Sequence, residues 1–276
     1  MNVGVCISHQ TGGMRDSIAS AADLGFKHCQ LVSWLPALWT QTEAESLTRL
    51  LEEYHITITA FWCGWEGPHA WDFISGPETL GLVPPTYRYA RIKNLCDGAD
   101  FARLLGVTDV ISHMGFIPEA LTDWNYPGTV EALRVVALHC VKNEQKLLFE
   151  TGQETPITLL RTIEDIGTGN VYINLDPANL ILYGKANPVD SLETFGAWIR
   201  GVHAKDGLYP TKGRALGQEV KIGEGKVDFP ALLNGLKALG YDGSLTIEHE
   251  IEVSLSQRHD DVRAAKDYLE SLIRTL

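Results

Sequence analysis

Four residues able to bind a metal ion follow short apolar runs in the second half of the chain. Glu150 ends KLLFE, Asp176 ends VYINLD, His203 lies in GVHAKD, and Glu248 follows SLTI. A carboxylate buried alone costs much free energy, and a bound cation removes most of that cost. Three carboxylates and one imidazole form a hard set of oxygen and nitrogen ligands. The pattern therefore indicates a site for one divalent ion, and Mn²⁺, Mg²⁺, Co²⁺ and Zn²⁺ are all compatible with it.

Apolar, β-branched runs alternate with amphipathic stretches along the chain. We expect eight strands, at Val3–Ser8, His28–Ser33, Ile56–Trp62, Asp109–His113, Lys146–Glu150, Val171–Asp176, Gly201–Ala204 and Ser244–Glu248. Helices are expected at Asp16–Leu24, Glu43–Tyr54, Tyr87–Leu105, Val130–Asn143, Pro156–Ile166, Val189–Trp198, Pro230–Leu239 and Asp260–Leu276.

Eight strand–helix units in 276 residues predict one α/β domain, 1–276, that closes into a (β/α)₈ TIM barrel. A doubly wound open sheet is the alternative. That fold needs a glycine-rich turn after its first strand, and the segment from His9 to Gly13 matches GxGxxG poorly.

In a parallel barrel, neighbouring strand ends lie about 5 Å apart, so four consecutive ends can meet at one ion. Each of the four residues, considered alone, also has a structural explanation that needs no metal ion. Asp176 precedes Pro177 and could begin a turn, His203 could be a core histidine, and the two glutamates could form ion pairs at the barrel rim. All four residues lie at the same end of their strands, and this common position favours one metal site over four separate structural explanations.

Two long connections follow strands, at residues 63–86 and 206–228. Long loops after barrel strands lie at the face where active sites are built, although a plain surface loop is the alternative for each.

The composition excludes several classes of protein. There are 23 Lys and Arg against 35 Asp and Glu, a formal charge of −12, which disfavours a nucleic-acid partner. Five scattered cysteines without CxxC spacing predict neither a disulfide scaffold nor a structural zinc site. No apolar run is long enough to cross a bilayer and no signal peptide is evident, so we expect a cytoplasmic protein without a membrane partner.

The motifs LLFETGQETP, NLDPANL, VHAKDG, KIGEGKVDF and GYDGSLTIEHE resemble the xylose isomerase-like barrel superfamily of sugar-phosphate isomerases and epimerases. The resemblance covers nearly the whole chain and is densest over residues 146–250. It implies that Glu150, Asp176, His203 and Glu248 hold one divalent metal ion at the ends of strands five to eight. It also implies a small carbohydrate substrate and, by analogy with related barrels, a homodimer or homotetramer.

The resemblance further implies proton transfer. Glu150 and Glu248 would flank a substrate carbon beside a carbonyl, one removing a proton and the other returning one on the opposite face. The expected activity is isomerisation or epimerisation of a ketose, aldose or inositol-like polyol. A metal-dependent lyase or dehydratase acting on a keto-sugar or keto-inositol is the second hypothesis.

Two further hypotheses are weaker. A non-catalytic sugar-binding barrel is disfavoured because both glutamates of the acid–base pair are present. A DNA-repair endonuclease, known from a related branch of the superfamily, would need more metal ligands and a basic face, which the charge of −12 opposes.

The chain departs from the ketose 3-epimerases of this superfamily at two positions. Three residues after the metal-binding aspartate it carries Asn179 in place of a substrate-binding histidine. Arg214 is the nearest candidate for an arginine that those enzymes place after the strand-seven histidine. We expect both residues to contact the substrate.

Four other residues are candidates for substrate binding from their positions alone. His113 ends strand four, and Lys205 lies two residues beyond His203, on the same face of an extended strand. Lys205 could instead pair with a nearby carboxylate. Trp62 and Glu66, at the start of the first long connection, are expected to form part of a wall that stacks on a sugar ring.

Overall fold

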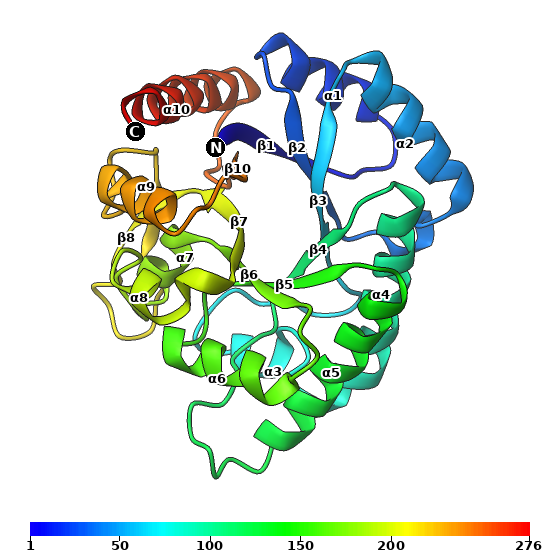
Figure 1. The fold of residues 1–276 in the computed structure, drawn as a ribbon, viewed down its shortest axis with the longest axis vertical. Helices are drawn as coiled ribbons and strands as arrows, with labels where there is room; N and C mark the ends of the chain where they lie inside the picture. Colours follow the sequence, from blue (N-terminus) through cyan, green and yellow to red (C-terminus); the bar gives the residue numbers. More distant parts are fainter.

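The computed structural model describes residues 1–276, and its centre is a closed barrel of eight parallel strands (Figure 1). Their order around the barrel is β1-β10-β7-β6-β5-β4-β3-β2. The strands are β1 (Asn2–Ser8), β2 (His28–Ser33), β3 (Thr57–Cys63), β4 (Asp109–Ser112), β5 (Lys146–Glu150), β6 (Val171–Leu175), β7 (Ile199–Ala204) and β10 (Ser244–Ile247). The predicted TIM barrel is confirmed, and the open-sheet alternative is wrong.

Helices surround the barrel and cover its outer face (Figure 1). They are α1 (Met14–Asp23), α2 (Gln41–Glu53), α4 (Pro85–Leu104), α5 (Tyr126–Lys142), α6 (Pro156–Ile166), α8 (Ser191–Phe195), α9 (Phe229–Ala238) and α10 (Leu255–Thr275). Shorter helices interrupt the loops: η1 (Pro36–Leu38), α3 (Gly76–Thr79), α7 (Pro177–Leu182) and η2 (Gly196–Trp198). None of the helices is both long and apolar enough to pass through a membrane.

Most predicted bounds lie within a few residues of the observed ones, and the differences have local causes. Helix α5 begins four residues before the predicted Val130, because Pro127 is compatible with the first turn of a helix. Helix α10 begins five residues before the predicted Asp260, where the Ser254 hydroxyl accepts a hydrogen bond from the Gln257 backbone N–H. The single helix predicted at Val189–Trp198 is wrong, because the chain changes to a 3₁₀ turn at Gly196.

The barrel has apolar packing outside its strands, and several polar side chains of the strands are buried within the protein. A cluster of 55 buried apolar residues lies between strands and helices, whereas only Ala60, Trp62, Ile111 and Leu148 form a second, separate cluster. Gln30, Asn174 and Thr246 are buried polar residues of the strands. A buried polar group needs partners, so this interior is suited to a polar site rather than to apolar packing alone.

The segment 206–228, expected to be a loop, contains a two-stranded antiparallel ribbon formed by β8 (Asp206–Leu208) and β9 (Gln218–Val220). The Asp206 carboxylate anchors it by accepting hydrogen bonds from the backbone N–H groups of Gly207, Gly223, Gly225 and Val227, at 2.8 to 3.0 Å. A Cβ at Gly225 would lie 2.0 Å from Asp206 Oδ1, so only glycine allows this close approach.

A completely buried arginine helps to hold the segment 63–86. Arg91 of α4 donates hydrogen bonds to the carbonyl oxygens of Gly81 and Pro68, both at 2.7 Å, and its guanidinium lies 5.1 Å from the Trp65 ring centre. Both long connections are therefore tied to buried charged side chains.

Replacing Asp206 with Ala removes the carboxylate that four backbone donors share. Hydrogen bonds to a charged group each contribute about 1.5–3 kcal/mol. Two of the four donors are only partly buried and can bond to water instead, so we expect the free energy of unfolding to fall by at least roughly 3 kcal/mol. Amide hydrogen exchange should also accelerate within residues 207–227. Urea unfolding and exchange measurements test this, with Asp242→Ala at an exposed position as the control. An Asp206→Ala protein as stable as the control, with unchanged exchange, would contradict the anchoring role.

Candidate functional site

The four predicted metal ligands meet at one end of the barrel. Glu150 ends β5, Asp176 follows β6, His203 lies in β7, and Glu248 follows β10. One ligand atom from each residue lies within 4.8 Å of the other three. The strands are consecutive neighbours around the barrel, which explains why residues far apart in the sequence meet here.

Asp176 uses its two carboxylate oxygens differently. It is the N-cap residue of α7, and its Oδ1 accepts the backbone N–H of Asn179 at 2.9 Å. The turn expected before Pro177 is therefore a helix start. Its Oδ2 is buried without a hydrogen-bond partner and lies 3.8 Å from His203 Nδ1. Burial raises the pKa of this carboxyl more than Lys205, whose Nζ lies 3.8 Å from Oδ2, lowers it, so a divalent cation would further stabilise the charged form.

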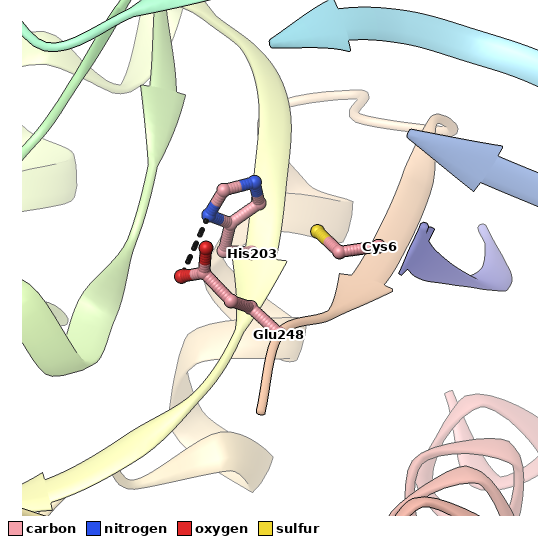
Figure 2. Close-up of side chains that lie close together, drawn as sticks. All are labelled: Cys6, His203 and Glu248. Atoms are coloured by element: carbon pink, nitrogen blue, oxygen red, sulfur yellow. Dashed lines mark ion pairs between the residues drawn. The ribbon is translucent and has the colours of Figure 1, made fainter. Parts of the chain in front are cut away.

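His203 is fully buried, and its two ring nitrogens face different partners. Nε2 lies 2.7 Å from Gln30 Oε1, whereas Nδ1 lies 2.9 Å from Glu150 Oε1 and 3.3 Å from Glu248 Oε2. Figure 2 shows Glu248 beside Nδ1, with Cys6 beyond the imidazole. Burial lowers the pKa of His203, but the charges of Glu150 and Glu248 outweigh burial and hold it well above its usual value.

Glu150 is buried among hydrogen-bond donors. The Trp62 indole N–H donates to its Oε2, and Asn179 Nδ2 lies 3.5 Å from its Oε1. His113 Nε2 lies 3.6 Å from Oε2. Burial alone would raise the pKa of Glu150, yet the neighbouring His113 and His203 lower it below the usual value. Glu150 is therefore a carboxylate rather than a carboxylic acid at neutral pH.

Glu248 is bound by a buried lysine. Lys205 Nζ lies 3.0 Å from Glu248 Oε2 and also forms an ion pair with Glu250. Burial raises the pKa of Glu248, but Lys205 and His203 more than offset burial and hold it well below its usual value. The same carboxylates keep the pKa of Lys205 well above its usual value despite burial, so it remains an ammonium ion.

The residues present fit a divalent cation. Asp176 Oδ2 and His203 Nδ1 are buried atoms without hydrogen-bond partners of good geometry, and both belong to the four-residue cluster. Carboxylate oxygens and an imidazole nitrogen are the donors that Mn²⁺, Co²⁺ and Zn²⁺ accept. Cys6 also lies near His203 and Glu248, but burial raises its pKa to about 11 and keeps it a neutral thiol.

A cavity of about 390 Å³ lies next to this cluster. Its lining includes Glu150 and Glu248 but neither Asp176 nor His203, which are completely buried. Its volume falls within the range of about 300–1,000 Å³ that is usual for small-molecule sites. The rest of its lining combines aromatic and polar side chains, among them Trp34, Trp62, Trp71, His113, Asn179, Tyr183, Lys205 and Glu250.

Four of the six predicted substrate-binding residues line this cavity: Trp62, His113, Asn179 and Lys205. Glu66 and Arg214 are exposed and do not belong to the lining, so the structure gives no support for their contact with substrate. The periodic pattern that locates strand ends does not determine the path of a long loop, and both residues lie on such loops.

Sequence reasoning missed several residues of the site. Gln30, Trp71, Tyr183 and Glu250 contact the cluster or line the cavity. Gln30 left a detectable signal, because it is a polar residue in the middle of the strand-like run HCQLVS. Trp71 lies in the first long loop and Tyr183 follows a short helix, so their arrival at the cavity depends on tertiary structure.

Residues 18–272 match the family described as the xylose isomerase-like TIM barrel. The chain belongs to this family. It is 32% identical to a xylose isomerase domain protein from Planctomyces limnophilus, whose crystal structure superposes with a TM-score of 0.92 and covers 99% of this chain and 97% of that one. The resemblance drawn from the sequence motifs is therefore confirmed.

Two other similar proteins are more distant. A D-tagatose 3-epimerase-like protein shares the fold at 21% identity and a TM-score of 0.76, covering 100% of this chain and 98% of that one. An inosose dehydratase from Geobacillus kaustophilus is 24% identical over 174 residues, 57% of this chain and 56% of that protein. The chain thus spans little more than half the length of the curated relatives it matches, 56% in each case.

Glu154 provides a test of the electrostatics around the site. It is completely buried, one of its oxygens has no hydrogen-bond partner, and burial raises its pKa to about 8. A carboxyl whose pKa is higher in the folded state contributes stability below its unfolded-state pKa of about 4.3, and this contribution is lost as pH rises towards 8.

The isosteric variant Glu154→Gln stays neutral at every pH. Its stability relative to the wild type should therefore increase by roughly 3 kcal/mol between pH 5 and pH 8.5 in urea unfolding. Glu193→Gln, at an exposed helix position, is the matched control. A difference between Glu154→Gln and wild type that does not change with pH would contradict the raised pKa.

Proposed function

We propose that this protein is a divalent-metal-dependent isomerase or epimerase of a small carbohydrate, a ketose, an aldose or an inositol-like polyol. One observation carries the proposal. Glu150 and Glu248 belong both to the four-residue cluster and to the cavity lining, whereas Asp176 and His203 belong to the cluster alone. The two glutamates thus line the cavity that we propose for the substrate, whereas Asp176 and His203 are buried behind them.

The proposed ligands of the ion are Glu150, Asp176, His203 and Glu248. A divalent ion held there would supply positive charge to stabilise the negative charge that develops on substrate oxygens during proton removal.

The chain's own residues supply the proton transfer. Glu150 and Glu248 are both ionised at neutral pH, so either can accept a proton from the substrate carbon beside a carbonyl. The electron pair of the broken C–H bond moves toward the carbonyl oxygen and gives an enediolate. The other glutamate, protonated from solvent, returns a proton to the opposite face. The two glutamates then regain their starting states by proton exchange with water.

Lys205 and the aromatic wall position the substrate. Lys205 is a buried ammonium ion on the cavity wall, and it can donate a hydrogen bond to a substrate hydroxyl or carbonyl oxygen. Trp34, Trp62 and Trp71 present ring faces and edges to the same cavity, which suits the apolar face of a sugar ring. His113 and Asn179 add polar groups near Glu150.

A lyase or dehydratase acting on a keto-sugar or keto-inositol is the second candidate. The 24% identity with an inosose dehydratase favours it, and the first step would be the same. After removal of the proton, the enediolate would re-form its carbonyl and a C=C bond as the β-carbon–oxygen bond breaks. The leaving hydroxyl would become water by taking a proton from the glutamate that had removed one from the substrate. The products distinguish the two activities.

Solvent deuterium exchange into a panel of ketoses, 3-ketoglycosides and inososes tests the proposal. We expect exchange with Mn²⁺ present, loss of exchange after chelation, and a decrease of at least about 100-fold in Glu150→Gln and Glu248→Gln. Glu164→Gln, at an exposed helix position, should exchange like the wild type. An isomeric product supports the first activity and a dehydrated product the second. Exchange that survives both glutamate substitutions would contradict the proposed acid–base pair.

A further inference from the structure

One buried hydrogen bond inside the barrel has no part in the proton transfer described above. It joins Gln30 of β2 to His203 of β7, with Gln30 Oε1 2.7 Å from His203 Nε2. Both side chains are buried, with exposed fractions of 2% and 0%. β1 and β10 separate these strands in the barrel, so the contact passes through the interior rather than along neighbouring strands.

We propose that Gln30 is a positioning residue that fixes the orientation and tautomer of His203 for metal binding. The inference rests on the proposed metal site. An amide oxygen is only an acceptor, so the nitrogen that faces it, Nε2, carries the hydrogen. A metal ion bound at Nδ1 displaces any proton there, so the ligating imidazole is neutral and keeps its single N–H group at Nε2. Nδ1 then gives its lone pair to the ion.

The lone pair of Nδ1 is then directed to the place where a ligand is needed. Nδ1 lies 2.9 Å from Glu150, 3.3 Å from Glu248 and 3.8 Å from Asp176, and it makes no hydrogen bond of good geometry. With the ring turned over about its Cβ–Cγ bond, Cδ2 would face the carboxylates in place of Nδ1, and Cε1 would face Gln30 in place of Nε2. The hydrogen bond thus selects one of two ring orientations.

A local irregularity of the sheet gives the Gln30 side chain its space. The register between β2 and β3 shifts at Gln30, which pairs with Ala60, whereas Cys29 pairs with Ile58. Thr59 is thus the extra residue of a bulge, and its hydroxyl donates a hydrogen bond to the Cys29 carbonyl oxygen at 3.0 Å. Bulges re-aim side chains near functional sites. Here the bulge places the small Ala60 beside Gln30.

A neutral amide also suits the charge of the site. Glu150, Asp176 and Glu248 already supply three carboxylates around His203, and a fourth beside Nε2 would add repulsion among them. Gln30 accepts the N–H without adding charge. Groups that orient a ligating histidine in this way typically change metal affinity by about 10–100-fold when they are removed.

The test uses the chelated full-length protein and Co²⁺ alone as the probe. Gln30→Met removes the acceptor at similar volume, and Gln30→Glu restores an acceptor. We expect Gln30→Met to weaken Co²⁺ binding in calorimetry by about 10–100-fold and to alter the visible absorption spectrum of bound Co²⁺. Gln30→Glu should bind Co²⁺ within a few-fold of the wild type, with a wild-type spectrum, because the bound cation offsets the repulsion that the added carboxylate causes in the metal-free protein. Gln41→Met, at an exposed position of α2, is the matched control.

Three results would overturn the inference. Wild-type affinity and spectrum in Gln30→Met would show that His203 needs no acceptor at Nε2. Equal weakening by Gln30→Met and Gln30→Glu would show that side-chain volume, not hydrogen bonding, is responsible. Absence of Co²⁺ binding in the wild type itself would instead reject the proposed metal site, and the role of Gln30 with it. Thermal melting of the metal-free variants verifies folding, and Gln30→Leu, which also removes the acceptor, replaces Gln30→Met if that variant does not fold.

Discussion

The structure depends on the concentration of negative charge at the ends of four neighbouring strands. Glu150, Asp176 and Glu248 lie within 4.8 Å of one another through single ligand atoms, in surroundings from which water is largely excluded. Carboxylates so close repel one another strongly unless cations offset their charge. His203 and Lys205 supply part of that compensation, and both have pKa values held well above their usual range by these carboxylates. A divalent ion would complete it.

The four residues of the cluster differ in their access to the cavity: two are buried behind the proposed ion site and two line the cavity in front of it. Asp176 is fixed by the start of α7, and His203 by Gln30. Glu150 and Glu248 lie in front, where they also line the cavity. Buried residues fixed by backbone and side-chain hydrogen bonds can hold an ion firmly. Carboxylates that face a substrate cavity can exchange protons with its contents.

The sequence predicts the barrel and the four-residue cluster because both depend on local patterns and on the geometry of parallel strands. An apolar run that ends in a carboxylate or histidine identifies a strand end, and barrel closure brings consecutive ends together. The path of long loops follows from tertiary contacts instead. Sequence patterns alone therefore predict neither the exposed positions of Glu66 and Arg214 nor the ribbon that Asp206 anchors. Gln30 is detectable as a polar residue within a strand-like run, but its pairing with His203 is not, because only the barrel brings β2 opposite β7.

Anomalous X-ray scattering from Mn²⁺-soaked crystals would show whether these four strand ends form one metal site. We expect one strong anomalous peak bounded by Glu150, Asp176 and Glu248 oxygens and by His203 Nδ1, at about 2.0–2.3 Å from each. Coordination through Nε2, a peak elsewhere in the barrel, or no peak at millimolar Mn²⁺ would contradict it.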